Sequence, residues 1–266
     1  MGIIPEAPLS GDDDKPGQAG VGRLPAGFSG FRYFDLIMAF FVAVLITSNV
    51  ASSAKIVDMG ITLFGFWGIH MAFDGGTILF PISYIFGDIL TEVYGFRASR
   101  RVIWIGFIAL ALTSLLFFIL KALPGDAAWE NYAGSGAYNA ILGGMSSGGI
   151  AAASLAGYLT GEFSNSVILS RLKVLMKGRV LWVRAIGSSL VGELLDSLVF
   201  VFVASLTGVF GWELFTALVL TNYLFKLFVE VIFLPLTYLA VRKLKKAESI
   251  DIYDIGIKYN LLREKK

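Results

Sequence analysis

Six carboxylates lie within long apolar stretches of this chain, where a membrane-spanning segment ordinarily carries aliphatic residues. Lys226 lies among them, and the carboxylates are Asp88, Glu92, Glu162, Glu193, Asp196 and Glu230. An ionisable side chain at the centre of a membrane helix costs about 2.5–3.5 kcal/mol on insertion scales, so such residues usually face a polar cavity and have a function. The chemistry open to this set is hydrogen bonding to a polar solute and the binding or release of protons.

The spacing of these residues predicts shared helix faces. Three sets have i,i+3 or i,i+4 spacing: Asp88 with Glu92, Glu193 with Asp196, and Asn222 with Lys226 and Glu230. Residues at these separations are neighbours on one side of a helix. Charged stripes of this kind cannot face lipid, so we expect them to converge on the interior of a helix bundle. The polar cluster Thr47–Asn49 adds a further polar surface from an apolar segment.

Composition indicates an all-α, multi-span membrane protein. Of 266 residues, 56% are hydrophobic and only 16% are charged, against about 25% charged in ordinary soluble domains. The net charge of +2 gives no reason to expect a nucleic-acid partner. The chain has no cysteine and one histidine, His70, which excludes disulfides and thiolate chemistry and argues against an imidazole zinc site. No cofactor and no enzymatic activity are expected.

Six stretches are long and apolar enough for spanning helices, which need about 20 residues. They cover about 34–54, 75–96, 102–121, 145–170, 183–207 and 212–241. The glycine-broken stretch 56–74 is interpreted as an external hairpin or re-entrant segment, and 122–144 as an external loop. Residues 1–30 lack any periodicity and are expected to be a disordered cytoplasmic segment. The transporter domain would then cover 31–245, followed by a cytoplasmic tail at 246–266.

The distribution of lysine and arginine predicts that both termini are cytoplasmic. With six spans, nineteen of the 22 cations fall on one side, whereas only Lys55 and Lys121 fall on the other. Cytoplasmic loops carry the excess of positive charge. We therefore expect a multi-pass protein of the cell (inner) membrane, N-in and C-in.

Counting residues from the cytoplasmic arginines predicts that most of the carboxylates share one depth. At about 1.5 Å per helical residue, five of them lie roughly 14–18 Å inside a hydrocarbon core of ~30 Å; Glu92 is shallower. A polar layer at half depth is the usual position of a transporter's substrate site. So many acids around one lysine cannot all be ionised, because desolvation and like charge both oppose ionisation. Proton coupling is therefore the expectation, with sodium coupling left open.

Structural explanations compete with functional ones for several residues. Glu92 is expected to pair with Arg97 or Arg100 at a helix end, and Lys226 with Glu230 in an intrahelical ion pair. Asn49 is a candidate for an interhelical hydrogen bond. Other features carry weaker expectations: His70 has no assigned role, Pro81 and Pro235 would kink or break helices, and Gly157, Gly161, Ala39 and Ala43 would permit close helix contacts.

Several blocks resemble one known family. FPISYIFGDILTEVYGFRASRRVIW (80–104) is similar to the central signature of the queuosine precursor transporters, also called the vitamin uptake transporter family. Further blocks match in the same order: TSN (47–49), ASLAGYLTGEFSNSVILSRLK (153–173), GSSLVGELLDSLVFVFVAS (187–205) and NYLFKLFVEVIFLPLTY (222–238). The resemblance covers most of the chain from residue 34 to about 245.

The resemblance implies uptake of 7-cyano-7-deazaguanine or its 7-aminomethyl relative, and the excess of buried acids adds the expectation of secondary transport with proton coupling. A carboxylate can accept the ring N–H and the exocyclic amine of a deazaguanine together; Asp88, Glu193 or Asp196 is expected in this role, with Glu162 nearby. The remaining expected contacts are hydrogen bonds from Asn49, Asn222 and Lys226 and stacking on Phe80, Tyr84 or Trp67. Glu92 and Glu230 are assigned to coupling or gating.

The expected partners are the small deazapurine and the lipid bilayer, with homo-oligomerisation left open. One alternative is a substrate-binding subunit of an energy-coupling-factor importer, which would need a separate ATPase. This chain has no GxxxxGK[ST] loop of its own. An intramembrane enzyme is disfavoured because no nucleophile–base set or HExxH motif is present.

Overall fold

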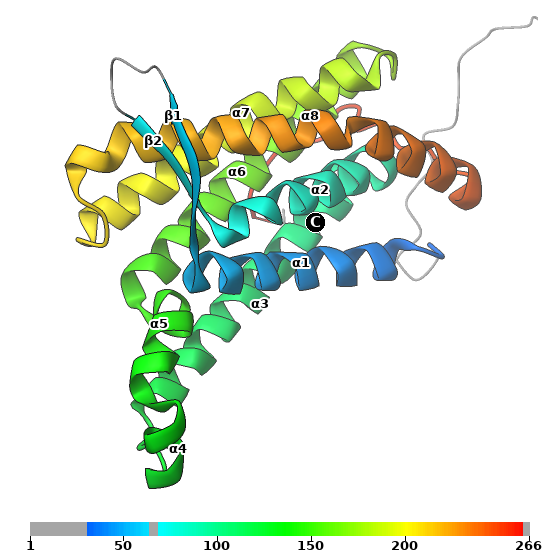
Figure 1. The fold of residues 1–266 in the computed structure, drawn as a ribbon. Helices are drawn as coiled ribbons and strands as arrows, with labels where there is room; N and C mark the ends of the chain where they lie inside the picture. The colour runs from blue at the N-terminus through cyan, green and yellow to red at the C-terminus, as the bar shows by residue number, and fades with distance from the viewer. Residues whose placement is uncertain (1–30, 64–68, 263–266) are drawn as a thin grey trace, which may run out of the picture. The chain divides into compact units, whose positions relative to one another are not determined.

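The computed structural model describes residues 31–63 and 69–262, and the side chains of Ile56 and of most residues from 59 to 74 are not described. The expectations for residues 1–30 and for Trp67 lie outside the described residues, as does the side chain of His70. Within this part, five segments are helical, long and apolar enough to cross a membrane: Phe34–Ala54, Phe96–Ala122, Gly134–Leu175, Leu181–Leu206 and Trp212–Glu248. An all-α membrane fold is thereby supported (Figure 1).

The helices bury polar residues and expose large apolar ones, as expected for a protein whose solvent is lipid. Helix α1 (Phe34–Ala54) buries Ser48 and Asn49, and α7 (Leu181–Leu206) buries serines together with Glu193 and Asp196. On α3 (Phe96–Ala122), by contrast, Ile108, Leu112 and Leu116 are about half exposed or more. This pattern is why the carboxylates form an internal layer.

The second expected span is shorter than its sequence suggests. The stretch from residue 75 begins with a 3-10 turn, η2 (Gly75–Ile78), and α2 runs only from Phe80 to Tyr94, with Pro81 in its first turn. Proline favours the first helical turn, where its missing N–H is not needed, so Pro81 starts the helix and does not kink it. Helix α2 is 15 residues long, about 22 Å at 1.5 Å per residue, which is shorter than the other spans.

An antiparallel strand pair precedes α2. β1 (Ile56–Leu63) pairs with β2 (Ile69–Asp74), with Ile56 opposite Asp74 and Leu63 opposite Ile69. This pair occupies the stretch interpreted as a hairpin or re-entrant segment; its external position stays a prediction. After β2 the chain approaches α1 so closely that a Cβ atom on Gly76 would collide with the backbone carbonyl of Ser48. Glycine is therefore required there, and it brings the start of α2 against α1.

The stretch expected to be an external loop is largely helical. It contains α4 (Ala127–Tyr132) and α5 (Gly134–Ser146), and Ser147 separates α5 from α6 (Gly148–Leu175). Asp126 caps α4, since its Oδ1 accepts a hydrogen bond from the backbone N–H of Ala128 at 2.9 Å. Side-chain caps of this kind replace the hydrogen bonds that a helix start lacks. The expectation of a loop over 122–144 was therefore wrong for most of its length.

Helices α6 and α7 pack closely through glycines. A Cβ on Gly157 would lie 2.7 Å from Oδ1 of Asp196, and one on Gly161 would lie 2.6 Å from Cβ of Asp196. Small residues allow membrane helices to approach in this way, so the contact predicted for this pair is confirmed. Ala39 and Ala43 are exposed on α1. The last helix, α8 (Phe215–Glu248), packs against α2 and α7 and contains Pro235.

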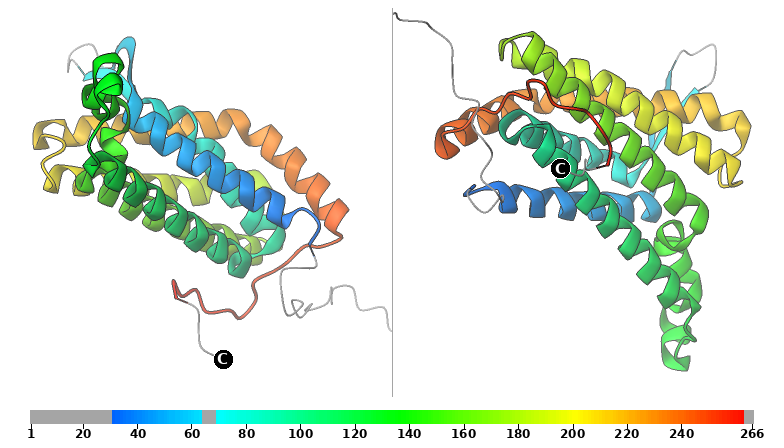
Figure 2. Two further views of the ribbon diagram at one scale, coloured as in Figure 1. Left: turned by 90° about the horizontal axis from the view of Figure 1, so that it is seen from below. Right: turned by 180° about the vertical axis from the view of Figure 1, so that it is seen from behind.

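The residues after α8 do not form a free tail. Helix α8 continues to Glu248, and residues 250–262, here called the C-terminal strap, run back across the ends of other helices (Figure 2). Oδ2 of Asp254 accepts hydrogen bonds from the backbone N–H of Phe96 at 2.8 Å and from Ser170 Oγ at 2.6 Å. The strap is therefore part of the packed structure, and the domain limit expected at residue 245 does not separate it.

Candidate functional site

A buried ion pair joins α7 to α8 at the predicted polar layer. Nζ of Lys226 lies 2.6 Å from Oδ2 of Asp196, and the two side chains are 7% and 9% exposed. The same ammonium lies 5.0 Å from the ring centroid of Phe80, over its face. The ion pair expected between Lys226 and Glu230 is not the one formed, because Asp196 on the neighbouring helix takes this place.

The pair borders a small cavity between α1, α2, α6, α7 and α8. Its lining consists of Ser52, Phe80, Ser154, Asp196, Phe200, Asn222 and Lys226. Its volume is about 20 Å³, room for about one water molecule. Four of the seven lining residues were predicted as substrate contacts. Ser52, Ser154 and Phe200 were missed, although Phe200 follows Asp196 by one helical turn.

A second group of polar side chains lies between α2 and α6. Glu162 is 1% exposed, and its Oε1 accepts a hydrogen bond from Ser83 Oγ at 3.2 Å. Gly87 leaves room for this carboxyl, because a Cβ there would lie 2.6 Å from Glu162 Oε2. The hydroxyl of Tyr84 is buried without a hydrogen-bond partner among the described residues. These two predicted residues face the packed interior, but neither lines the cavity.

Among the described residues, Asp88 is hydrogen-bonded to α6 and forms no ion pair with a cation. Its Oδ1 accepts a hydrogen bond from Asn165 Nδ2 at 2.8 Å, and both residues are buried. Asn165 was not predicted as a site residue, because the prediction was based on charged residues at helical spacing and asparagine is uncharged. It is found three residues after Glu162, on the same buried face of α6.

Glu193 and Glu230 bring two carboxyl groups together. They are 0% and 2% exposed, and the two carboxyls lie within electrostatic reach of each other. Oε1 of Glu230 also accepts a hydrogen bond from Ser189 Oγ at 2.5 Å. Neither oxygen of Glu193 meets a donor group from any other described residue.

Asn49 is buried on α1, but its amide group is used locally. Nδ2 donates to the backbone carbonyl of Leu45 at 2.8 Å, within the same helix. The bond from Asn49 is thus intrahelical, contrary to the interhelical one considered from the sequence. Its contact with a substrate stays a prediction.

Glu92 belongs to a separate ionic cluster, away from the cavity lining. Three cations surround its Oε1: Lys245 at 2.6 Å, Arg184 at 2.8 Å and Lys173 at 3.8 Å. The expected partners Arg97 and Arg100 were wrong; Arg100 instead donates to the backbone carbonyl of Asn260 at 2.8 Å. Glu92 therefore joins the ends of α2, α6, α7 and α8.

Asp251 of the strap completes this Glu92 cluster. Its Oδ1 lies 2.6 Å from Lys173 Nζ and 2.8 Å from Lys245 Nζ. Partial burial opposes ionisation of this carboxyl, but the hydrogen bonds and charges of the two lysines outweigh burial and lower the pKa of Asp251 below its ordinary value. The strap is thus fastened by charge as well as by the Asp254 hydrogen bonds.

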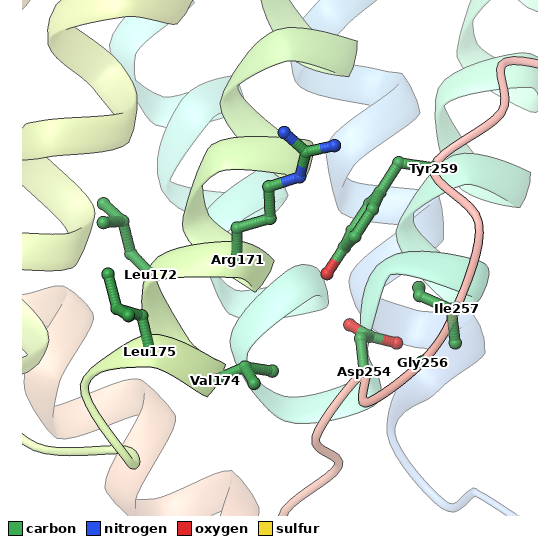
Figure 3. Close-up of a pocket in the computed structure, with 8 residues that line it drawn as sticks. All are labelled: Arg171, Leu172, Val174, Leu175, Asp254, Gly256, Ile257 and Tyr259. Atoms are coloured by element: carbon green, nitrogen blue, oxygen red, sulfur yellow. The ribbon is translucent and has the colours of Figure 1, made fainter.

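A groove lies between the end of α6 and the strap (Figure 3). It measures about 430 Å³ and is lined by Arg171, Leu172, Val174, Leu175, Asp254, Gly256, Ile257 and Tyr259. The guanidinium of Arg171 lies 4.8 Å from the centroid of the Tyr259 ring. Most of the lining is apolar, so this groove offers few of the convergent polar groups that a small polar solute needs.

Comparisons with known proteins show the family to which the chain is similar. Residues 74–240 match the model of a family described as "Putative vitamin uptake transporter". The chain is 26% identical to the "Probable queuosine precursor transporter" of Bacillus subtilis over 65% of this chain and 73% of the relative. It is 24% identical to the "Queuosine precursor transporter" of Escherichia coli over 69% and 77%, respectively. No solved structure matches the chain at a significant level.

Proposed function

Since the chain belongs to the vitamin uptake transporter family, we propose that it carries a queuosine precursor, 7-cyano-7-deazaguanine or 7-aminomethyl-7-deazaguanine, into the cell. It is a multi-pass membrane transporter of a small molecule, and two relatives named for queuosine precursors support this substrate. We further propose that uptake is secondary active and coupled to protons. No chemical change of the solute is part of the proposal.

The observation that carries the proposal is the Asp196–Lys226 pair beneath the Phe80 ring. A deazaguanine presents a ring N–H beside an exocyclic amine, and a carboxylate accepts such a donor pair through both oxygens. Asp196 would take this part, while Lys226 and Asn222 would donate to the ring carbonyl. Phe80 offers a flat face for the bicycle, and stacking of a base on an aromatic ring contributes ~1–3 kcal/mol.

Binding must open the pair. The cavity of about 20 Å³ is far smaller than a bicyclic ring system. The described state therefore has no room for the solute at this place. When the ring donors engage Asp196, they replace Lys226 on that carboxylate. The ammonium can then donate a hydrogen bond to the carbonyl of the solute. Both Asp196 and Lys226 would therefore have a hydrogen-bond partner with and without the solute. This exchange limits the cost of opening a buried ion pair.

The other predicted residues would act around this centre. Asp88 and Glu162 lie on the two helices that face the pair, each with one hydrogen-bonded neighbour, Asn165 or Ser83. Glu193 and Glu230 supply the protonatable groups that coupling requires. Glu92 lies in its own ionic cluster with Arg184 and Lys245. This position supports a role in gating and not a contact with the solute.

Uptake by the purified chain in liposomes tests the proposal. With an inward proton gradient and no ATPase, labelled 7-cyano-7-deazaguanine should accumulate inside, whereas Asp196→Asn should abolish accumulation. The matched control is Asp35→Asn, which changes an exposed carboxylate in the first turn of α1 and should transport normally. No uptake by the chain alone, but uptake after addition of an energy-coupling ATPase module, would favour the alternative of a substrate-binding subunit.

A further inference from the structure

Glu193 and Glu230 are two buried carboxyls whose surroundings favour a bound proton. They are 0% and 2% exposed, and neither oxygen of Glu193, nor Oε2 of Glu230, has a hydrogen-bond partner among the described residues. Two ionised carboxylates buried within electrostatic reach of each other are costly, because desolvation and like charge both oppose ionisation. A proton bound to one of them removes one of the two charges.

The groups facing the carboxyl pair come from four helices. Those within electrostatic reach are Tyr84 and Asp88 on α2, Glu162 on α6, Asp196 on α7, and Tyr223 and Lys226 on α8. Among them Lys226 is the cation, and it is in contact with Asp196. The pair is therefore next to the proposed substrate groups but is not one of the cavity-lining residues.

Ser189 is positioned to respond to the proton. Its single hydroxyl hydrogen has two acceptors within reach: Glu230 Oε1 at 2.5 Å and Asn165 Oδ1 at 3.5 Å. When Glu230 is ionised, Ser189 donates to it. When Glu230 carries the proton, the carboxyl can donate to Ser189 Oγ, and the hydroxyl hydrogen turns to Asn165. Asn165 in turn donates to Asp88 at 2.8 Å, so the state of Glu230 reaches α2.

We propose that the Glu193–Glu230 pair carries the proton that moves with the solute, and that Ser189 transmits its state through Asn165 to Asp88. This inference rests on the proposed function and assigns the coupling step within it. The only bond that changes is O–H: a carboxylate of the pair takes a proton from water on the outer side, and the carboxyl returns it to water on the inner side when the site opens. In the closed, dry state the pair retains the proton.

Two transport modes of the reconstituted protein separate coupling from substrate recognition. Exchange of labelled for unlabelled 7-cyano-7-deazaguanine at equal pH needs binding and opening but no net proton movement. Accumulation against a gradient of one pH unit needs coupling, and can reach about tenfold for one proton per solute because one pH unit is a factor of ten in proton activity. Wild type should show both.

Glu230→Gln should retain exchange but lose accumulation, because the amide keeps the shape of the side chain and can still accept the hydrogen bond from Ser189 without binding a proton. Ser189→Ala should retain exchange and lower the accumulation ratio. Ser188→Ala is the matched control: Ser188 is equally buried, but its hydroxyl donates to Ala185 within its own helix, and accumulation should stay at the wild-type value.

The inference is overturned if Glu230→Gln accumulates solute like wild type, or if Ser188→Ala and Ser189→Ala have equal effects. Should Glu230→Gln fail to fold, the comparison of the two serine variants tests the inference. Absence of exchange in wild type would instead refute the proposed function, whereas exchange without any proton-driven accumulation in wild type would refute only the coupling inference.

Discussion

At the scale of single residues, the central feature is a buried ion pair whose members come from different helices. Removing one partner of such a pair typically costs about 3–5 kcal/mol, because the other charge remains buried and unpaired. Lys226→Met should therefore lower the thermal stability of the purified protein. The double variant Lys226→Met/Asp196→Asn should recover much of that stability, since no charge is left unpaired.

The same double variant should not bind the deazaguanine, because both substrate-contacting groups are gone. Thermal unfolding in detergent measures the first effect and ligand titration the second. Equal stability losses in the single and double variants would show that the pair is not the source of the effect.

Asp88 gives a second residue-scale prediction. In Asp88→Asn the side-chain carbonyl can still accept the hydrogen bond from Asn165 Nδ2, so folding and membrane insertion should be unchanged. Uptake should be lost, because a carboxyl group that can bind or release a proton is removed next to the proposed substrate and coupling groups. Uptake in liposomes and gel filtration of the variant measure the two properties, and wild-type uptake would remove Asp88 from the site.

Helical spacing predicted much of the site at this scale. Asn222 and Lys226 were predicted to share a helix face, and both line the same cavity as Asp196. This prediction was possible because i,i+4 neighbours share a face whatever the tertiary fold. Partners could not be predicted in the same way. Glu92 pairs with cations more than 80 positions further along the chain, where local spacing carries no information.

At the scale of elements, the C-terminal strap was not predicted from the sequence, and it packs across the ends of α3 and α6. Arg100 donates to the carbonyls of Asn260 and Leu262, at 2.8 and 3.4 Å. These contacts predict that Arg100→Ala accelerates hydrogen exchange in the strap and leaves ligand affinity unchanged. A selective loss of affinity would contradict this assignment.

The strap should also respond to acid through Asp251. The pKa of this carboxyl is lowered below 3.8 in the folded state, so its contribution to stability is complete above that value and is lost as the pH falls through the folded pKa. Hydrogen exchange of residues 250–262, corrected for intrinsic rates, should therefore rise below about pH 4. In Asp251→Asn this acid step should disappear; its persistence would assign it to another carboxyl.

Element boundaries were predicted unevenly. Long apolar runs predicted that α1, α3, α6, α7 and α8 exist, because burial in lipid demands continuous helix; α3 nevertheless begins at Phe96 and not near 102, and α8 ends at Glu248 and not near 241. Helix α2 begins late because Pro81 starts it and the two preceding glycines allow the approach to α1. The packing of the strap was not predicted, because its contacts are with residues remote in sequence. Asp251, Asp254 and Asn260 contact Lys173, Phe96 and Arg100, respectively.

At the scale of the whole molecule, the orientation rests on the placement of cations, and the chain allows a direct test. Because it has no cysteine, single cysteines can be introduced without background. Lys121→Cys should react with a membrane-impermeant thiol reagent in intact cells, whereas Lys243→Cys should react only after permeabilisation. Both positions are exposed. Reaction of both from the same side would refute the N-in, C-in arrangement with six crossings.

The cavity beside the Asp196–Lys226 pair has room for about one water molecule, so under the proposed function the helices must separate for the solute to enter. The Glu92 cluster and the strap join the ends of four helices, and the Asp196–Lys226 pair joins α7 to α8. We therefore expect the solute to bind by separating groups that are already paired.

The most direct test of this account is a titration of the purified protein with 7-cyano-7-deazaguanine, its 7-aminomethyl relative and guanine, across pH and sodium concentration. The account predicts saturable binding of a deazaguanine, weakened about 10–100-fold by Asp196→Asn, because hydrogen bonds to a charged group contribute about 1.5–3 kcal/mol. Binding of equal strength in wild type and Asp196→Asn, or no binding of any of the three compounds, would contradict it.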